Sequence, residues 1–206
     1  MCFSAPASFI ASGGLAVLGG STLVMAKKHD KILATVPLLF AAQQGIEGFQ
    51  WIALNHGTTS PTAGYAFLFF AFIVWPIYVP TLVYILDKEK RKIVMWFIFL
   101  GVGVAAYFLR LLLTETLVVS EMRSCVSYTF NFPFENLIVV PYLIAIFGSL
   151  FASDNKIFRR FGVLTAGLAY ISWLFYTVAF TSVWCFFAAI ASSIIFIHIM
   201  YRRKTT

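Results

Sequence analysis

The sequence predicts an all-α, polytopic integral membrane protein with seven transmembrane helices, an N-terminus outside the cell and a C-terminus in the cytoplasm. Hydrophobic residues make up 61% of the 206-residue chain, and charged residues only 11%. The mean hydropathy is +0.89. Basic residues also gather in alternate connections between the apolar segments. A soluble domain has a far more even balance of residue types, so these observations indicate a membrane protein.

Seven apolar segments approach the length of about 20 residues that a helix needs to cross the hydrocarbon core of a bilayer. The fifth segment is short, and the sixth and seventh meet in a very tight turn. We expect residues 1–206 to form a single transmembrane domain, with a long outer loop at about 114–136. The predicted spans cover residues 5–26, 32–54, 63–86, 93–113, 137–152, 161–182 and 183–201.

The basic residues predict the orientation of these spans, because lysine and arginine favour the cytoplasmic side of short connections. Of the 15 basic residues, only Arg110 and Arg123 fall at the opposite end. The N-terminus is therefore expected outside and the C-terminus inside. The other basic residues lie in the first, third and fifth connections and in the tail: Lys27, Lys28, Lys31, Lys88, Lys90, Arg91, Lys92, Lys156, Arg159, Arg160, Arg202, Arg203 and Lys204.

The formal net charge of +7 follows from this topology and does not indicate binding of nucleic acid. Membrane lipids are the expected partners, since anionic lipids of the inner leaflet attract basic residues. We therefore expect a multi-pass protein of the cell inner (plasma) membrane. A small-molecule ligand is also expected, but composition and charge do not identify it.

A polar stretch, PLLFAAQQGIEGFQW, interrupts the second predicted span. On a helix, Gln43, Glu47 and Gln50 fall within about 60° of one another, and Gln44 lies beside them. Glu47 is expected about 6 Å outside the midpoint of the span. Polar groups at that depth face the interior of the bundle or a wet cavity. Glu47 is therefore a candidate catalytic residue, and the three glutamines are candidate ligand contacts.

Two further residues are candidate ligand contacts in the same outer layer, namely Arg110 near the end of the fourth span and Tyr176 in the sixth. An alternative interpretation is a packing network in which Glu47 is protonated or paired with Arg110. The connection at 114–136 carries apolar and aromatic residues, and we expect it to cover the bundle as a lid or short interfacial helix. An ordinary amphipathic surface loop is the alternative.

The three cysteines, Cys2, Cys125 and Cys185, all fall on the predicted outer side. An oxidising exterior permits one disulfide among them. A bond between Cys125 and Cys185 would tie the long connection to the start of the seventh span. The alternative is that all three remain thiols. Cys2 would be left over as a candidate catalytic nucleophile.

A metal site would have to combine different ligand types, because the chain has only three histidines. Cys2, Glu47 and His56 are the candidate ligands on the outer side. Their ligand types suit a divalent metal ion such as zinc or copper as a cofactor, but their spacing is not diagnostic. The alternative for His56, within NHGTTSPTAG, is a solvated loop histidine.

The chain begins Met-Cys-Phe-Ser at residues 1–4 and carries Pro-Leu-x-Phe-x-x-Gln-Gln-x-x-Glu-Gly at residues 37–48, in the second predicted span. In these two motifs, which lie in its first quarter, the chain resembles an uncharacterised bacterial family of multi-pass membrane proteins. Length and span count agree over the rest of the chain. The resemblance implies no activity, but it implies that Cys2, Gln43, Gln44 and Glu47 belong to one site.

Two classes of function remain open on the sequence. One is a membrane enzyme or small-ligand binder whose polar site, dependent on a thiol or a metal, lies in the outer half of the bundle around Cys2 and Glu47. The other is a transporter or sensor of a small polar or cationic ligand. Alternating access needs a second polar layer in the inner half, where this sequence offers little. That difference favours the first class.

Overall fold

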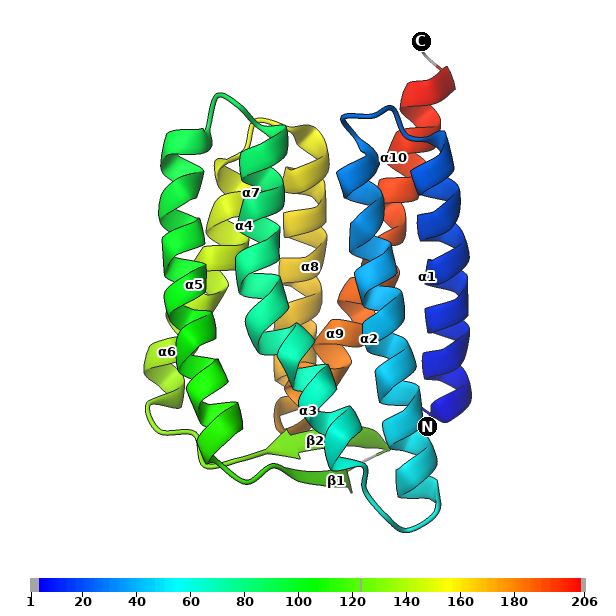
Figure 1. The fold of residues 1–206 in the computed structure, drawn as a ribbon, viewed down its shortest axis with the longest axis vertical. Helices are drawn as coiled ribbons and strands as arrows, with labels where there is room; N and C mark the ends of the chain where they lie inside the picture. Colours follow the sequence, from blue (N-terminus) through cyan, green and yellow to red (C-terminus); the bar gives the residue numbers. More distant parts are fainter. Residues whose placement is uncertain (1–3, 123, 205–206) are drawn as a thin grey trace. The chain divides into compact units, whose positions relative to one another are not determined.

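The computed structural model describes residues 4–122 and 124–204, in which the chain is predominantly helical (Figure 1). Short π-helical segments η1 (Phe70–Val74) and η2 (Ile144–Gly148) and a 3₁₀ turn η3 (Thr177–Ala179) interrupt the longer helices. The α-helices are α1 (Ala5–Met25), α2 (Lys31–Asn55), α3 (Pro61–Phe69), α4 (Trp75–Leu86), α5 (Arg91–Thr114), α6 (Glu135–Leu143), α7 (Ser149–Ala152), α8 (Lys156–Phe175), α9 (Phe180–Ala191) and α10 (Ser193–Lys204).

Several helical segments are long and apolar enough to cross a membrane, as the sequence predicts. Large apolar side chains such as Val24, Trp96 and Leu113 are 85%, 73% and 77% exposed, which suits helices that face lipid. A shorter apolar run covers Leu137–Ala152. Within the described residues, the five segments that meet both criteria are Ala5–Met25, Lys31–Asn55, Pro61–Leu86, Arg91–Thr114 and Thr177–Arg203.

The chain divides into two compact units. The first unit contains Met1–Phe67, Val119–Tyr128 and Gly167–Thr206, and the second contains Leu68–Val118 and Thr129–Ala166. A single domain over residues 1–206 stays a prediction.

In the first unit, α1 and α2 lie side by side and antiparallel (Figure 1). Small residues permit this close approach. A Cβ on Gly48 would fall 2.7 Å from the Phe9 ring, and one on Gly19 would fall 2.7 Å from Leu38. The Ser12 hydroxyl also donates a 2.7 Å hydrogen bond to the carbonyl oxygen of Ala41. These contacts hold the polar face of α2 at a fixed position along α1.

In the second unit, Pro76 follows the π-helical turn η1 and leaves one carbonyl group of that turn without a π-helical donor. In a π-helix the carbonyl of residue i accepts from the N–H of residue i+5. For Ala71 that residue is Pro76, which has no N–H. The Tyr142 hydroxyl instead donates a 2.6 Å hydrogen bond to the Ala71 carbonyl oxygen, so the buried carbonyl is satisfied by a side chain.

The predicted boundary between the sixth and seventh spans is wrong. The sequence places Ser182 at the end of one span and Val183 at the start of the next, whereas both lie inside α9. The turn comes earlier, after α8 ends at Phe175 and through η3. The stretch ISWLFYTVAFTSVWCF contains no glycine, proline or charge, so hydropathy gives no sign of this turn.

The connection at 114–136 forms a two-stranded sheet of β1 (Val118–Met122) and β2 (Cys125–Thr129) instead of a short interfacial helix. Ser124 adopts a positive φ of 58° in the turn between them. Val118, Val119 and Val126 are β-branched residues that favour strands. The sequence therefore carried a strand signal that the expectation of a helix overlooked.

Candidate functional site

The polar residues of α2 are buried in the first unit. Gln43, Gln44 and Gln50 are 0% exposed, and Glu47 is 2% exposed. The helix places them on one face because they recur at intervals of three and four residues. A buried carboxylate among amides is costly unless hydrogen bonds or a positive charge compensate it, so the partners of Glu47 decide what the site can do.

Glu47 accepts hydrogen bonds from two helices. The Ser182 hydroxyl on α9 donates to Glu47 Oε1 over 2.6 Å, and Gln44 Nε2 on α2 donates to Oε2 over 3.4 Å. The ion pairs of the described residues do not include Glu47. The carboxylate is thus held by neutral donors, without a lysine or arginine to balance its charge. Sequence reasoning missed Ser182, since a serine in an apolar helix carries no distinctive signal.

Tyr128 and Cys185 lie near this carboxylate. Tyr128, on β2, stacks on Phe67 with ring centroids 4.9 Å apart. Burial raises the pKa of Tyr128 well above its ordinary value, and the nearby Glu47 and Cys185 raise it further. Cys185 lies three residues after Ser182 on α9, and the Gln43 side chain makes a hydrogen bond with it. The hairpin and two helices therefore converge on Glu47.

The site also contains buried polar atoms with unused hydrogen-bonding capacity. Gln44 Oε1, Trp51 Nε1 and Tyr128 Oη have no hydrogen-bond partner among the described residues. Buried polar groups in proteins are almost always satisfied, so each such atom calls for an explanation. Gln44 Oε1 is an acceptor, Trp51 Nε1 a donor, and Tyr128 Oη can serve as either. These atoms therefore leave unused hydrogen-bonding capacity beside the buried carboxylate.

Gln50 has a different role from the other glutamines. With its amide oriented to suit its neighbours, its nitrogen donates to the Ser60 carbonyl oxygen over 2.6 Å and its oxygen accepts from Ser60 N over 3.3 Å. Ser60 in turn accepts from Ala63 N at the start of α3 over 3.3 Å. Gln50 therefore holds the connection between α2 and α3 in place. Both polar atoms of its side chain form hydrogen bonds with the backbone of Ser60.

The residues predicted as metal ligands do not form a metal site in the described part of the chain. Glu47 is buried, whereas His56 is exposed and its Nδ1 lies 2.8 Å from the carbonyl oxygen of Ile52. Nine residues of helix separate the two by about 180° of rotation, so they face opposite ways. Among the described residues, no three His, Cys, Asp or Glu side chains gather as metal ligands. Cys2 lies outside the described residues, and its catalytic role stays a prediction.

The predicted disulfide is also absent, because Cys125 and Cys185 are both buried thiols. The alternation of side chains along a strand explains why. On β2, the Tyr128 hydroxyl is close enough to Cys185 for the thiol to raise its pKa. Cys125 lies three residues earlier on the same strand, so its side chain points to the opposite face. The bond predicted from a shared side of the membrane is therefore wrong.

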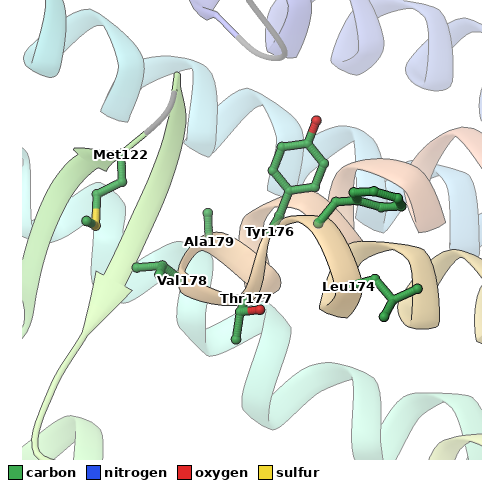
Figure 2. Close-up of a pocket in the computed structure, with 7 residues that line it drawn as sticks. Met122, Leu174, Tyr176, Thr177, Val178 and Ala179 are labelled. Carbon is green, nitrogen blue, oxygen red and sulfur yellow. The ribbon is translucent and has the colours of Figure 1, made fainter.

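Two more residues are predicted ligand contacts, Arg110 and Tyr176. Arg110 is an exposed residue of α5 in the second unit. Tyr176 lies in the turn after α8, where it lines an apolar pocket of about 290 Å³. Figure 2 shows Tyr176 and Thr177 projecting to opposite sides of this turn. The other lining residues are Met122, Leu174, Phe175, Val178 and Ala179.

The pocket adjoins the hairpin of the first unit. The Ser127 hydroxyl on β2 donates a 3.0 Å hydrogen bond to the carbonyl oxygen of Val178. Ser127 precedes Tyr128, and Val178 lies four residues before Ser182. The turn that shapes the pocket is thus attached to two elements that also reach Glu47.

Comparisons with known proteins give a family but no activity. No curated protein and no solved structure matches the chain. One family does match, and its description is a family of unknown function (DUF6629). The match covers residues 1–206, so the chain belongs to this family of unknown function.

Proposed function

We propose that this chain is a multi-pass protein of the cell inner membrane with seven spans, an outer N-terminus and a cytoplasmic C-terminus. The five long apolar segments support membrane insertion. Two further segments support the remaining spans. They are the shorter apolar run Leu137–Ala152 and the helix Lys156–Phe175, which overlaps the predicted span 161–182. The alternation of basic connections along the sequence supports the orientation.

We further propose that the first unit binds a small monovalent cation at Glu47. The observation that carries this proposal is a fully buried carboxylate with neutral hydrogen-bond donors and without an ion-pair partner among the described residues. In a low-dielectric layer an uncompensated carboxylate costs much free energy. A bound cation would neutralise the carboxylate and so remove that cost. The surrounding polar oxygen atoms could coordinate the same cation.

The chemistry of the neighbouring atoms supports a hard, singly charged guest. Glu47, Ser182, Tyr128 and the unpartnered Gln44 Oε1 all offer oxygen atoms, the ligand type that hard cations prefer. The same oxygens can accept hydrogen bonds from an ammonium group. A single carboxylate balances one positive charge, whereas a divalent ion would keep an uncompensated charge in the membrane interior. Sodium, potassium, ammonium and methylammonium are therefore the probes to test.

A thermal-unfolding experiment tests this proposal. The purified protein in detergent is titrated with chlorides of these cations, and N-methylglucamine chloride keeps the ionic strength constant. A ligand at 100 times its Kd stabilises a protein by about 2.7 kcal/mol. We expect at least one cation to raise the unfolding midpoint of the wild type but not that of Glu47→Gln.

The proposal is overturned if none of these cations raises the midpoint of the wild type. An equal rise in Glu47→Gln would also overturn it, because the response would then come from another place. Circular dichroism at the start of each titration shows that Glu47→Gln is folded. Uptake of the responsive cation by proteoliposomes would then separate transport from binding alone.

A further inference from the structure

A buried aspartate joins two turns at one end of the second unit. Asp87 follows α4, and its Oδ2 accepts a 2.6 Å hydrogen bond from the Ser153 hydroxyl and a 3.0 Å bond from Asp154 N. Its Oδ1 accepts from Lys90 N over 3.4 Å. Ser153 and Asp154 connect α7 to α8. One carboxylate therefore holds the α4–α5 turn against the α7–α8 turn.

A second set of contacts strengthens this arrangement. Lys90 Nζ lies 3.1 Å from Asp154 Oδ2, which adds an ion pair between the same two turns. Arg91 Nε donates to the Tyr84 carbonyl oxygen over 3.0 Å, and its guanidinium lies 5.1 Å from the centre of the Tyr84 ring. Asp87 and Asp154 therefore both bind partners within these two turns.

Other basic side chains at this end are left exposed to solvent. They lie immediately after the apolar helix that ends at Leu86 and in the first turns of α5 and α8. Basic residues at the ends of membrane-spanning helices are expected to meet the lipid headgroups. Glu89 and Asp154 are the exposed acidic residues of these two turns, and Asp154 is paired with Lys90. We call this set the basic turn surface: Lys88, Lys92, Lys156, Arg159 and Arg160, which are exposed and have no ion pair among the described residues.

We propose that the basic turn surface binds the phosphate headgroup of an anionic phospholipid and that Asp87 positions it. Scattered basic residues near a membrane give only a diffuse attraction of about 1 kcal/mol each. Here the hydrogen bond between Asp87 and Ser153, 66 residues apart, joins two connections and so brings their basic residues to the same end of the second unit. Preorganisation of this kind lowers the cost of ordering side chains on binding. The inference is independent of the cation proposed at Glu47.

The protein is first placed in nanodiscs that contain equal amounts of phosphatidylglycerol and phosphatidylcholine. The test measures how much lipid stays bound to the protein when it is taken out of them. After extraction and purification, retained phosphatidylglycerol is counted by native mass spectrometry. The triple variant Lys156→Gln, Arg159→Gln, Arg160→Gln should retain several-fold less than the wild type. A matched control, Lys27→Gln, Lys28→Gln, Arg203→Gln, removes the same charge from exposed residues of the first unit. It should lose little.

Substitution of Asp87 distinguishes a lipid site that Asp87 positions from a diffuse attraction between lipid and basic residues. Asp87→Asn makes the protein more positive, so a diffuse attraction predicts more retained phosphatidylglycerol, whereas a positioned site predicts several-fold less. Ser153→Ala loosens the same turn without a change in charge and should also retain less. The proposal is overturned if both variants retain as much as the wild type or more. It is also overturned if the control loses as much lipid as the triple variant.

Competition with soluble anions identifies the source of the phosphate. Excess inorganic phosphate or glycerophosphoglycerol should displace little retained lipid if the membrane-anchored headgroup is the ligand. Full displacement by inorganic phosphate would overturn the lipid proposal in favour of a free anion.

Discussion

The Ser182 hydroxyl donates a 2.6 Å hydrogen bond to the Glu47 carboxylate, and this contact joins α9 to α2 across 135 residues of sequence. Both side chains are buried in the first unit, with 2% of each exposed. A short bond between buried polar groups orients the carboxylate as well as stabilising it. Glu47 therefore belongs to α2, and its carboxylate is oriented by a residue of α9.

Ser182→Ala should lower the stability of the first unit by about 1–3 kcal/mol, because the buried carboxylate loses its shorter hydrogen bond. Ser192→Ala is the matched control. The Ser192 hydroxyl is also buried, at the C-terminal end of α9, but it donates its 2.6 Å hydrogen bond to the nearby carbonyl oxygen of Ala189 and to no carboxylate. Thermal unfolding in detergent compares the two variants. Equal losses would show that Ser182 merely fills space.

Gln50→Ala should lower stability by about 1–3 kcal/mol through the loss of two hydrogen bonds to the backbone of Ser60. Because these bonds fasten a connection and do not involve Glu47, the rise in unfolding midpoint on adding the responsive cation should persist. Disappearance of that rise, with the fold intact by circular dichroism, would place Gln50 in the binding site.

Gly101→Ala should destabilise the second unit strongly, because the new Cβ would overlap the backbone carbonyl of Pro76 and a helix would have to move. Gly103→Ala is the control on the same helix. Apart from the adjacent residues and the backbone of α5 itself, no atom of the described residues lies within 4 Å of a Cβ at Gly103. Alanine should therefore be neutral or stabilising by up to about 1 kcal/mol. Similar unfolding midpoints for the two variants would contradict the close packing of α4 and α5.

The contribution of Asp87 should depend on pH. Burial alone would raise the pKa of Asp87, but hydrogen bonds from Ser153 and from the backbone of Asp154, Lys90 and Glu89 lower it below the ordinary 3.8. A lowered pKa in the folded state means that the stabilisation is complete above 3.8 and is lost as pH falls below that value. The stability difference between wild type and Asp87→Asn should therefore shrink below pH 3.8. A difference that persists in acid would contradict this account.

Hydropathy predicts much of this fold because lipid-facing helices must be apolar over their whole length. The ends of α1 and α2 fall within one residue of the predicted spans 5–26 and 32–54. The turn before α9 could not be predicted, because its residues are as apolar as the helices that it joins. Val118 and Val126 favour strands, but two valines in a long connection do not by themselves distinguish a hairpin from a short interfacial helix.

The candidate site could be predicted only in part. The spacing of glutamine and glutamate on α2 predicts one polar face, because helical periodicity alone determines it. Its partners Ser182 and Tyr128 depend on tertiary packing, since a serine in an apolar helix and a tyrosine in a connection are common residues. The proposed disulfide failed for the same reason. A shared side of the membrane says nothing about which face of a strand carries Cys125.

The most direct test of the cation site at Glu47 is equilibrium binding by isothermal titration calorimetry. The cation that stabilises the wild type is titrated into wild type, Glu47→Gln and the fold control Gly103→Ala at constant ionic strength. We predict saturable binding of one cation per chain to wild type and to Gly103→Ala, and none to folded Glu47→Gln. Binding to Glu47→Gln with the affinity of the wild type would contradict the account.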